Sequence, residues 1–242
     1  QSGCRARPVS GNGSETAMSG RLIVLEGLDG CGKATQTKLL CQALEARGIP
    51  VCHISFPDYG QPSSALVKLY LNGAFGKNPN DVNPYAAASF YTVDRFASYQ
   101  QFWKAAYLAG QTIIADRYTT SNLIYQLPKL PRAEWEAFGA WLFDFEYQKC
   151  GLPQPNLTFY LDMPSAASRK LMEKRYAGDT SREDIHEQNA AYQAACREAA
   201  LYAARRFDWQ VIVCAQGEQV RSPVSIHQEI LQKFDACCPQ RV

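Results

Sequence analysis

The sequence contains no apolar run close to the roughly 20 residues that a membrane-spanning helix needs. It also has little net charge. Lys and Arg number 25 and Asp and Glu 23, which gives +2 over 242 residues and argues against a nucleic-acid binder with a broad basic surface. Glycine and proline follow no short period, so a collagen-like chain is excluded. The hydrophobic fraction of 46% is ordinary for a globular protein and excludes wholesale disorder.

Cysteine is the one unusual count, with nine residues at scattered positions. No two of them form the Cys-x-x-Cys pair of a zinc ribbon or a thioredoxin-like motif. Disulfide frameworks are typical of shorter, secreted chains. We therefore expect mostly reduced thiols, several of them in the core, in a cytoplasmic protein.

The first 20 residues differ in composition from the rest, because they are rich in Gly, Ser and Arg and poor in apolar residues. We expect residues 1–20 to be a flexible extension or tag, with Met18 as a candidate natural start. A remnant of an organellar presequence is the alternative interpretation. Residues 21–242 contain no linker and are expected to form a single domain.

Short apolar runs alternate with longer helical patterns after residue 20. The runs predicted to be buried strands are 22–25, 51–56, 112–115, 157–161 and 211–213. The segments predicted to be helices are 35–46, 64–71, 84–108, 132–149, 165–175, 187–206 and 224–234. This alternation predicts an α/β fold in which a five-stranded parallel sheet carries helices on both faces.

A glycine-rich segment, EGLDGCGKAT at 26–35, follows the first predicted strand and precedes a helix. The spacing from Gly27 to Gly32 and Lys33 is that of a Walker A phosphate loop. Backbone N–H groups and the helix N-terminus attract phosphate, and the lysine reaches the outer phosphates. The residues expected to bind ATP are Gly27, Gly30, Cys31, Gly32, Lys33, Ala34 and Thr35. A merely structural turn is the less favoured alternative.

Ala34 departs from the strict pattern, which has Ser or Thr at this place to bind Mg²⁺ through a hydroxyl. We therefore expect Mg²⁺ to be held by phosphates and water, with carboxylates further out. Asp116, acting through water, and Asp162 are the candidates, because both end predicted strands. For Asp162, capping of the following helix is an equally good interpretation.

A second motif, DRYTTSNLIYQ at 116–126, follows the third predicted strand. Its Asp-Arg-Tyr-x-x-Ser pattern resembles the thymidylate kinase family. Further matches are Phe56 followed by proline, Tyr91 with Arg95 four residues on, and the acidic Asp29 in the phosphate loop. The resemblance covers 21–234. It implies a P-loop NTPase-type kinase that phosphorylates dTMP to dTDP with ATP and Mg²⁺ in dTTP synthesis, has a mobile lid at about 174–187, and is a homodimer.

The resemblance also implies an acceptor site. The residues implied to bind dTMP are Asp29, Phe56, Tyr91, Arg95, Arg117, Ser121, Tyr125 and Gln126. Arg117 would bind the acceptor phosphate, with an ion pair to Asp116 as the alternative. Tyr91 would stack on thymine, or else only pack in the core, and Arg95 would donate to O4 of the base. Gln126 could read the base edge and Tyr125 contact the sugar.

Asp58 is a further departure, because many members of the family carry an arginine just after the proline at 57. A carboxylate would repel the acceptor phosphate. Either Asp58 turns away, or Arg117 and Lys68 suffice, or the acceptor is bound differently.

Phosphoryl transfer needs positive charge over the migrating group, and this phosphate loop contains no arginine. We therefore expect Lys33 and Arg117 to act with a lid arginine, Arg182 rather than Arg175, although a solvated basic surface is the alternative. Cys31 at a helix N-terminus could be a reactive thiol, but a small residue that simply fits the loop is favoured.

Two other functions stay open. Residues 32–36, GKATQ, are also similar to adenylate kinases, so another nucleoside monophosphate kinase or a deoxynucleoside kinase is an alternative. Ala34 and Asp58 motivate a catalytically weakened, nucleotide-binding regulatory protein. The sequence does not decide how strictly dTMP is preferred over dUMP.

Overall fold

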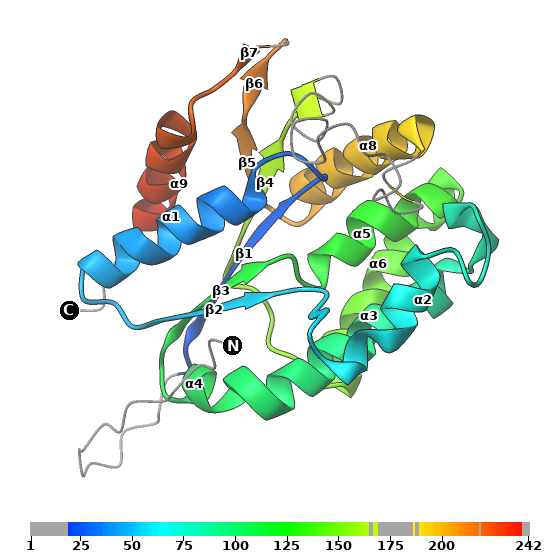
Figure 1. Cartoon of the computed structure of the whole chain (residues 1–242), viewed down its shortest axis with the longest axis horizontal. Coiled ribbons are helices and arrows are strands. Elements are labelled where there is room, and N and C mark those ends of the chain that lie inside the picture. The colour runs from blue at the N-terminus through cyan, green and yellow to red at the C-terminus, as the bar shows by residue number, and fades with distance from the viewer. Residues whose placement is uncertain (1–18, 165–166, 169–185, 187–188, 218, 239–242) are drawn as a thin grey trace.

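The computed structural model describes residues 19–164, 167, 168, 186, 189–217 and 219–238. They contain a five-stranded sheet in the order β2-β3-β1-β4-β5, and every neighbouring pair is parallel (Figure 1). The strands are β1 (Arg21–Gly27), β2 (Val51–Ser55), β3 (Thr112–Asp116), β4 (Leu157–Asp162) and β5 (Gln210–Val213). The predicted α/β fold and its five strands are confirmed.

The register of the central strands decides which loops meet. Leu25 of β1 pairs with Asp116 of β3 on one side and with Phe159 of β4 on the other. The segment after Gly27 and the segment after Asp116 therefore leave the sheet side by side at the carboxyl edge. This edge is where parallel α/β sheets bind their ligands.

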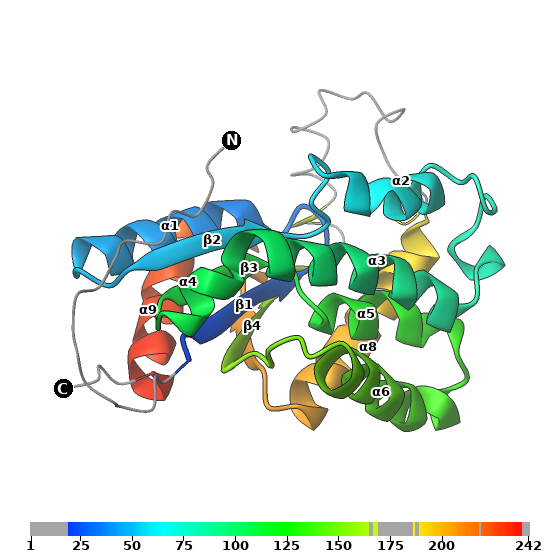
Figure 2. The same cartoon turned by 90° about the horizontal axis from the view of Figure 1, so that it is seen from below.

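One face of the sheet is covered by α1 (Lys33–Ala46) and α9 (Pro223–Cys237), which contact each other (Figure 2). Ile23, Phe159 and Ile212 point to this face and pack with Leu40 of α1. In α9, the buried side chains recur every four residues at Ile226, Ile230 and Phe234. That spacing places them on a single helix face, which is the face that α9 turns to the core.

The opposite face carries a larger group of helices, which comprises α3 (Pro84–Ser98), α4 (Lys104–Leu108), α5 (Thr120–Gln126), α6 (Trp135–Phe143) and α8 (Ala190–Arg206). Figures 1 and 2 both place this group across the sheet from α1 and α9. Leu22 and Val24 of β1 face this side, since neighbouring residues of a strand point to opposite faces. α2 (Ala65–Leu71) lies against the outer side of α3.

Two predicted helices are interrupted by π-helical segments. The segment predicted at 84–108 contains a π-helix at Tyr99–Trp103 between α3 and α4. The segment predicted at 132–149 begins with a 3-10 turn at Arg132–Glu134 and ends in a π-helix at Asp144–Lys149. Further 3-10 turns are Pro62–Ser64, Pro79–Asp81 and Leu127–Lys129. π-helical segments often mark functional positions. The second π-helix, Asp144–Lys149, carries the buried Glu146.

Helix α5 and a small antiparallel pair, β6 (Ala215–Gln216) and β7 (Gln219–Val220), were not predicted. The two short strands span too few residues for any periodicity to be read. The predicted helix at 165–175 and the predicted lid fall almost entirely outside the described residues, and so does most of the predicted N-terminal extension. Among the described residues, no helix is long and apolar enough to cross a bilayer.

The described cysteines are mostly free. The free thiols are Cys31, Cys41, Cys150, Cys196, Cys214, Cys237 and Cys238, of which four are buried. Cys52 is disulfide-bonded. Burial raises the pKa of the Cys214 thiol to about 12, which agrees with its expected role as a small core residue.

The packing of α9 yields a stability prediction. Ile230→Ala should lower the free energy of unfolding by about 2–5 kcal/mol, because it leaves a cavity between α9 and the sheet. Val224→Ala on the same helix is the matched control, since Val224 is exposed and its truncation should cost less than about 0.5 kcal/mol. Urea unfolding followed by circular dichroism measures both, and equal losses would contradict the described packing of α9.

Candidate active site

The phosphate loop joins β1 to α1, and its backbone requires glycine at several places. Gly30 and Gly32 have φ values of 76° and 89°, in the left-handed region that other residues rarely adopt. A Cβ on Gly27 would lie 2.5 Å from Sγ of Cys31 and 3.0 Å from the carbonyl oxygen of Leu161. These positions therefore depend on glycine for the loop to curl as it does.

Lys33, the first residue of α1, is buried and turns back into this loop. Its Nζ donates to the carbonyl oxygens of Gly27 and Leu28, both at 2.9 Å, and lies 4.0 Å from a carboxylate oxygen of Asp29. Ala34 and Thr35 follow on the exposed side of the first helical turn. The ammonium group of the lysine thus lies at the centre of the loop, where it is hydrogen-bonded to two loop carbonyls and lies close to the Asp29 carboxylate.

Cys31 lies inside the loop and is 2% exposed. Burial raises the pKa of its thiol, although Lys33 and Arg117 act in the opposite direction. A buried thiol with a raised pKa is a poor nucleophile. The structure therefore favours the interpretation of Cys31 as a small residue that fits the loop.

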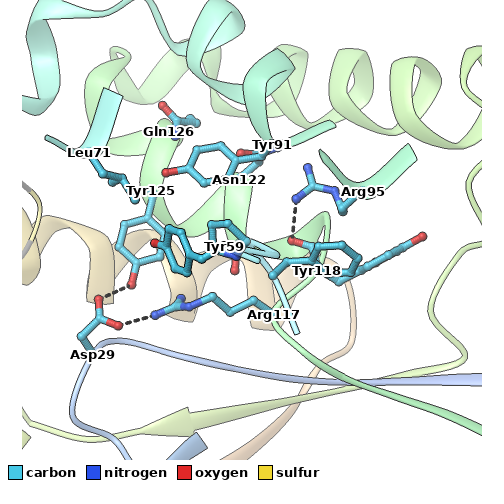
Figure 3. Close-up of a pocket in the computed structure, with 13 residues that line it drawn as sticks. Asp29, Tyr59, Leu71, Tyr91, Arg95, Arg117, Tyr118, Asn122, Tyr125 and Gln126 are labelled. Carbon is cyan, nitrogen blue, oxygen red and sulfur yellow. Dashed lines mark hydrogen bonds and ion pairs between the residues drawn. The ribbon is translucent and has the colours of Figure 1, made fainter. Parts of the chain in front are cut away.

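Asp29 joins the phosphate loop to the segment after β3. Its carboxylate forms an ion pair with Nη2 of Arg117 and accepts a hydrogen bond of 3.1 Å from the Tyr125 hydroxyl (Figure 3). The Arg117 guanidinium also lies 5.3 Å from the centre of the Tyr125 ring. Arg117 has a φ of 66°, an uncommon value for a residue other than glycine and one that is often found at functional sites.

Electrostatics keep this group charged. Burial opposes ionisation of Asp29, but Arg117 and Lys33 outweigh it and lower the pKa of the carboxyl to about 2. Burial also opposes the charge on Arg117, and Asp29 nonetheless raises the pKa of the guanidinium well above its usual value. An ion pair of Arg117 with Asp116 alone was the sequence-based alternative. This alternative is wrong, because the acid that Arg117 contacts is Asp29.

A pocket opens beside Asp29 and Arg117. The residues that line it are Asp29, Phe56, Pro57, Tyr59, Leu71, Tyr91, Arg95, Arg117, Tyr118, Ser121, Asn122, Tyr125 and Gln126. All eight residues expected to bind the acceptor nucleotide are among them, although they come from five separate segments of the chain. Asp58 is not in this set, whereas both of its neighbours are. Of the three alternatives for Asp58, this favours the one in which it turns away from the acceptor.

Gln126 and Ser121 contribute polar atoms to this pocket. The side chain of Gln126 is fully buried, and neither its amide oxygen nor its amide nitrogen has a hydrogen-bond partner among the described residues. Burying a polar atom without a hydrogen-bond partner is costly, and a ligand bound in the pocket would supply partners for both atoms. The Ser121 hydroxyl donates 2.8 Å to Glu26.

Two fully buried carboxylates that the sequence did not point to flank the segment after β3. Glu26 accepts from the backbone N–H of Tyr118 and the hydroxyls of Thr120 and Ser121. Burial raises the pKa of Glu26, although Arg117 and these donors oppose the shift. Glu146 accepts from donors on the other side, Arg95 among them. No periodic or motif signal marks either residue as a partner of this segment.

The carboxylates considered for Mg²⁺ have different surroundings. Asp162 at the end of β4 is held in a bidentate pair by Nε and Nη2 of Arg197, at 2.7 and 2.8 Å. Asp116 ends β3 and is partly buried. Within the described part of the chain, no three His, Cys, Asp or Glu side chains gather to form a metal site. Arg175 and Arg182 lie outside the described residues.

The fold and the glycine-rich loop define a protein of the P-loop NTPase class. The family model for thymidylate kinase matches residues 25–226. The thymidylate kinase of Mycobacterium tuberculosis is 31% identical over 188 residues, which cover 75% of this chain and 84% of that protein. The thymidylate kinase of Syntrophus aciditrophicus is 28% identical over 216 residues, 88% of this chain and 93% of that protein. The chain belongs to the thymidylate kinase family and is a kinase.

A solved structure agrees on the fold. The thymidylate kinase of Candida albicans superposes with a TM-score of 0.67 over 90% of this chain and 92% of that one, at 22% sequence identity. At that identity the likeness concerns the arrangement of strands and helices.

A group of polar side chains lies behind Tyr125. The ring of His186 stacks on Tyr125 at 5.2 Å between centroids, and its Nε2 lies 2.9 Å from the Tyr70 hydroxyl. Nζ of Lys129 donates to the same hydroxyl at 2.8 Å and to the carbonyl of Val82 at 3.3 Å. Burial lowers the pKa of Lys129 to about 7, so the native protein carries this lysine largely uncharged at mildly alkaline pH.

This lowered pKa predicts a pH dependence of stability. Between pH 7 and 10 the unfolded chain binds a proton on Lys129 that the native protein has released, so this residue makes stability rise with pH. The free energy of unfolding of the wild type relative to Lys129→Met should rise by about 1–2 kcal/mol from pH 7.5 to 9. Chemical unfolding at each pH measures the difference, and the exposed Lys149→Met is the control. Parallel curves for wild type and Lys129→Met would refute the shift.

Proposed function

We propose that this enzyme transfers the γ-phosphoryl group of ATP to dTMP and forms dTDP, for dTTP synthesis. The observation that carries the proposal is the position of Asp29. It belongs to the phosphate loop, yet its carboxylate is bonded to two residues of the acceptor pocket, Arg117 and Tyr125. The donor and acceptor sites thus adjoin at this residue, as in-line transfer between two bound nucleotides requires.

The phosphate end of the acceptor is assigned to Arg117. The planar guanidinium matches the geometry of a phosphate, and its left-handed backbone conformation directs it from the end of β3 toward Asp29. Phe56 and Ser121 line the same pocket. Because Asp58 lies outside this lining, Arg117 need not compete with that carboxylate.

The base end is assigned to Tyr91, Arg95 and Gln126. The ring of Tyr91 offers an apolar surface on which thymine stacks, and Arg95 donates to the base from the next turn of α3. Gln126 supplies the two polar atoms that lack partners in the described residues. Tyr125 lies between the two ends and contacts the sugar. Asp29 accepts a hydrogen bond from the 3′-hydroxyl of that sugar.

The nucleotide donor is assigned to the phosphate loop, with ATP held by Gly27, Gly30, Cys31, Gly32, Lys33, Ala34 and Thr35. Mg²⁺ accompanies ATP and neutralises charge on its phosphates. Ala34 offers no hydroxyl and Asp162 is paired with Arg197, so phosphates and water would hold most of the Mg²⁺ coordination shell, and Asp116 would act through water. Mg²⁺ readily keeps water ligands, which fits a site with few protein ligands.

The assembly is proposed to be a homodimer in the cytoplasm. Exposed apolar side chains gather on two helices that contact each other, Leu66 and Leu69 on α2 and Val93 and Phe96 on α3. In each helix the two residues are three positions apart and therefore lie on one face. A second copy of the chain would cover apolar surface of this kind.

A panel of acceptors tests the function. With ATP and Mg²⁺, dTMP should be phosphorylated with the highest kcat/KM of the common nucleoside monophosphates, because the pocket offers both a stacking ring and a donor to the base. Coupled assays with dTMP, dUMP, dCMP, AMP and UMP measure this order. Turnover confined to AMP or UMP would point to another monophosphate kinase, and binding without turnover to a regulatory protein.

The lid arginines form a separate prediction. Arg182→Ala should lower kcat by a factor on the order of 10³ with little change in the KM of either substrate, because it removes positive charge that stabilises the migrating phosphoryl group. Arg175→Ala is the matched control and should change kcat far less. The reverse order of effects would assign the catalytic role to Arg175, and two active variants would exclude both.

A further inference from the structure

The inference starts from Glu146, a fully buried carboxylate in the π-helical segment Asp144–Lys149. It does not line the pocket, but two residues that do, Arg95 and Asn122, donate to it. In all, its two oxygens accept from five donor atoms, namely Nε and Nη2 of Arg95, the hydroxyls of Thr92 and Thr119, and Nδ2 of Asn122. An arrangement with five donors requires an acceptor-only group at this position.

Glu146 fixes the plane of the Arg95 guanidinium. Nε donates to Oε2 at 2.8 Å and Nη2 to Oε1, so the contact is bidentate. Such a fork sets orientation as well as distance. In the part of the chain that the structure describes, Nη1 has a single, long contact of 3.4 Å, to the carbonyl of Tyr118 (Figure 3). The guanidinium edge that carries Nη1 is therefore the donor left for a ligand in the pocket.

Glu146 also decides which way the Asn122 amide points. Nδ2 donates to Oε1 of Glu146 at 3.2 Å and faces the carbonyl oxygen of Ala88 at 3.5 Å. Both neighbours are acceptors, so a flipped amide would place oxygen against oxygen. The Oδ1 atom of Asn122 is consequently the one that is left to accept from the pocket side.

We propose that Glu146 is a positioning residue that sets the hydrogen-bonding polarity of the base end of the pocket, with Arg95 as donor and Asn122 as acceptor. This polarity complements a base edge with a carbonyl beside a ring N–H, as in thymine and uracil. It opposes an amino group beside an unprotonated ring nitrogen, as in cytosine. The inference rests on the proposed function, since it concerns how that acceptor site selects its base.

Glu146→Gln tests this role because the glutamine has nearly the same shape and one acceptor oxygen fewer. At least one of the donor groups around it then faces an NH₂ group. Either the guanidinium loses its fork or the Asn122 amide becomes free to flip. Both changes relax the polarity of the base end without removing any side chain that lines the pocket.

The measurement compares two acceptors, dTMP and 5-methyl-dCMP, which differ only at the edge that Arg95 and Asn122 would face. Glu146→Gln should lower the ratio of their kcat/KM values by about tenfold or more. The ratio of dTMP to dUMP, which reports only on the 5-methyl group, should stay within about twofold. Both ratios are independent of the folded fraction, because each is measured on one preparation.

Glu26→Gln is the matched control. Glu26 is equally buried and bonded to the same segment, but its side-chain donors among the described residues are Thr120 and Ser121 rather than Arg95 and Asn122. This variant should slow all acceptors by a similar factor and leave both ratios unchanged. Thr119→Val is a milder second variant, which removes one donor to Glu146 and should lower the dTMP to 5-methyl-dCMP ratio by about two- to threefold.

The outcomes separate the possibilities. Wild-type ratios in both Glu146→Gln and Thr119→Val would overturn the inference, and so would a uniform loss in Glu146→Gln that matches Glu26→Gln. If Glu146→Gln yields no folded enzyme, Thr119→Val decides by the same ratio. A wild-type enzyme that does not phosphorylate dTMP would instead refute the proposed function, and this is visible before any variant is compared.

Discussion

The ion pair between Asp29 and Arg117 is the interaction on which the rest of the site depends. Asp29 is part of the loop after β1, and Arg117 begins the loop after β3. The parallel pairing of these two strands brings the loops to one edge, and the ion pair then fixes their relative position. The hydroxyl of Tyr125, on α5, donates to the same carboxylate and so fixes the position of α5 beside the pocket.

The fold could be predicted because its signals are local. Each strand is an apolar run bounded by breakers, and the phosphate loop has a fixed spacing of Gly and Lys between a strand and a helix. Helix α5 was missed, because the sequence from 119 to 126 mixes buried polar residues with apolar ones and shows no simple helical stripe. Three of its polar side chains, Thr120, Ser121 and Asn122, donate to Glu26 or Glu146, and pairing of that kind is visible only in three dimensions.

The pocket residues could be named from the family resemblance, but their partners could not. Arg95 is recognisable four residues after Tyr91, whereas Glu146 lies about 50 positions further along the chain in a π-helical turn that no periodicity indicates. The alternative interpretation of Arg117, an ion pair with Asp116 alone, was wrong for a related reason, since Asp116 is its neighbour in sequence and Asp29 its neighbour in space. Sequence proximity is a poor guide to charge pairing at the edge of a parallel sheet.

The position of Lys33 has a consequence for how the site meets its substrates. Lys33 is already bonded to carbonyl oxygens of its own loop, and Arg117 to Asp29. Both cations thus already have oxygen partners within the protein, so a bound phosphate either shares these cations with those partners or replaces them. A simple counterion can replace one of these oxygen partners, whereas two nucleotides that meet at Asp29 can replace several of them at once. Which ligand this site selects therefore depends on whether the ligand's oxygens bind Lys33 and Arg117 more strongly than the protein's own oxygens do.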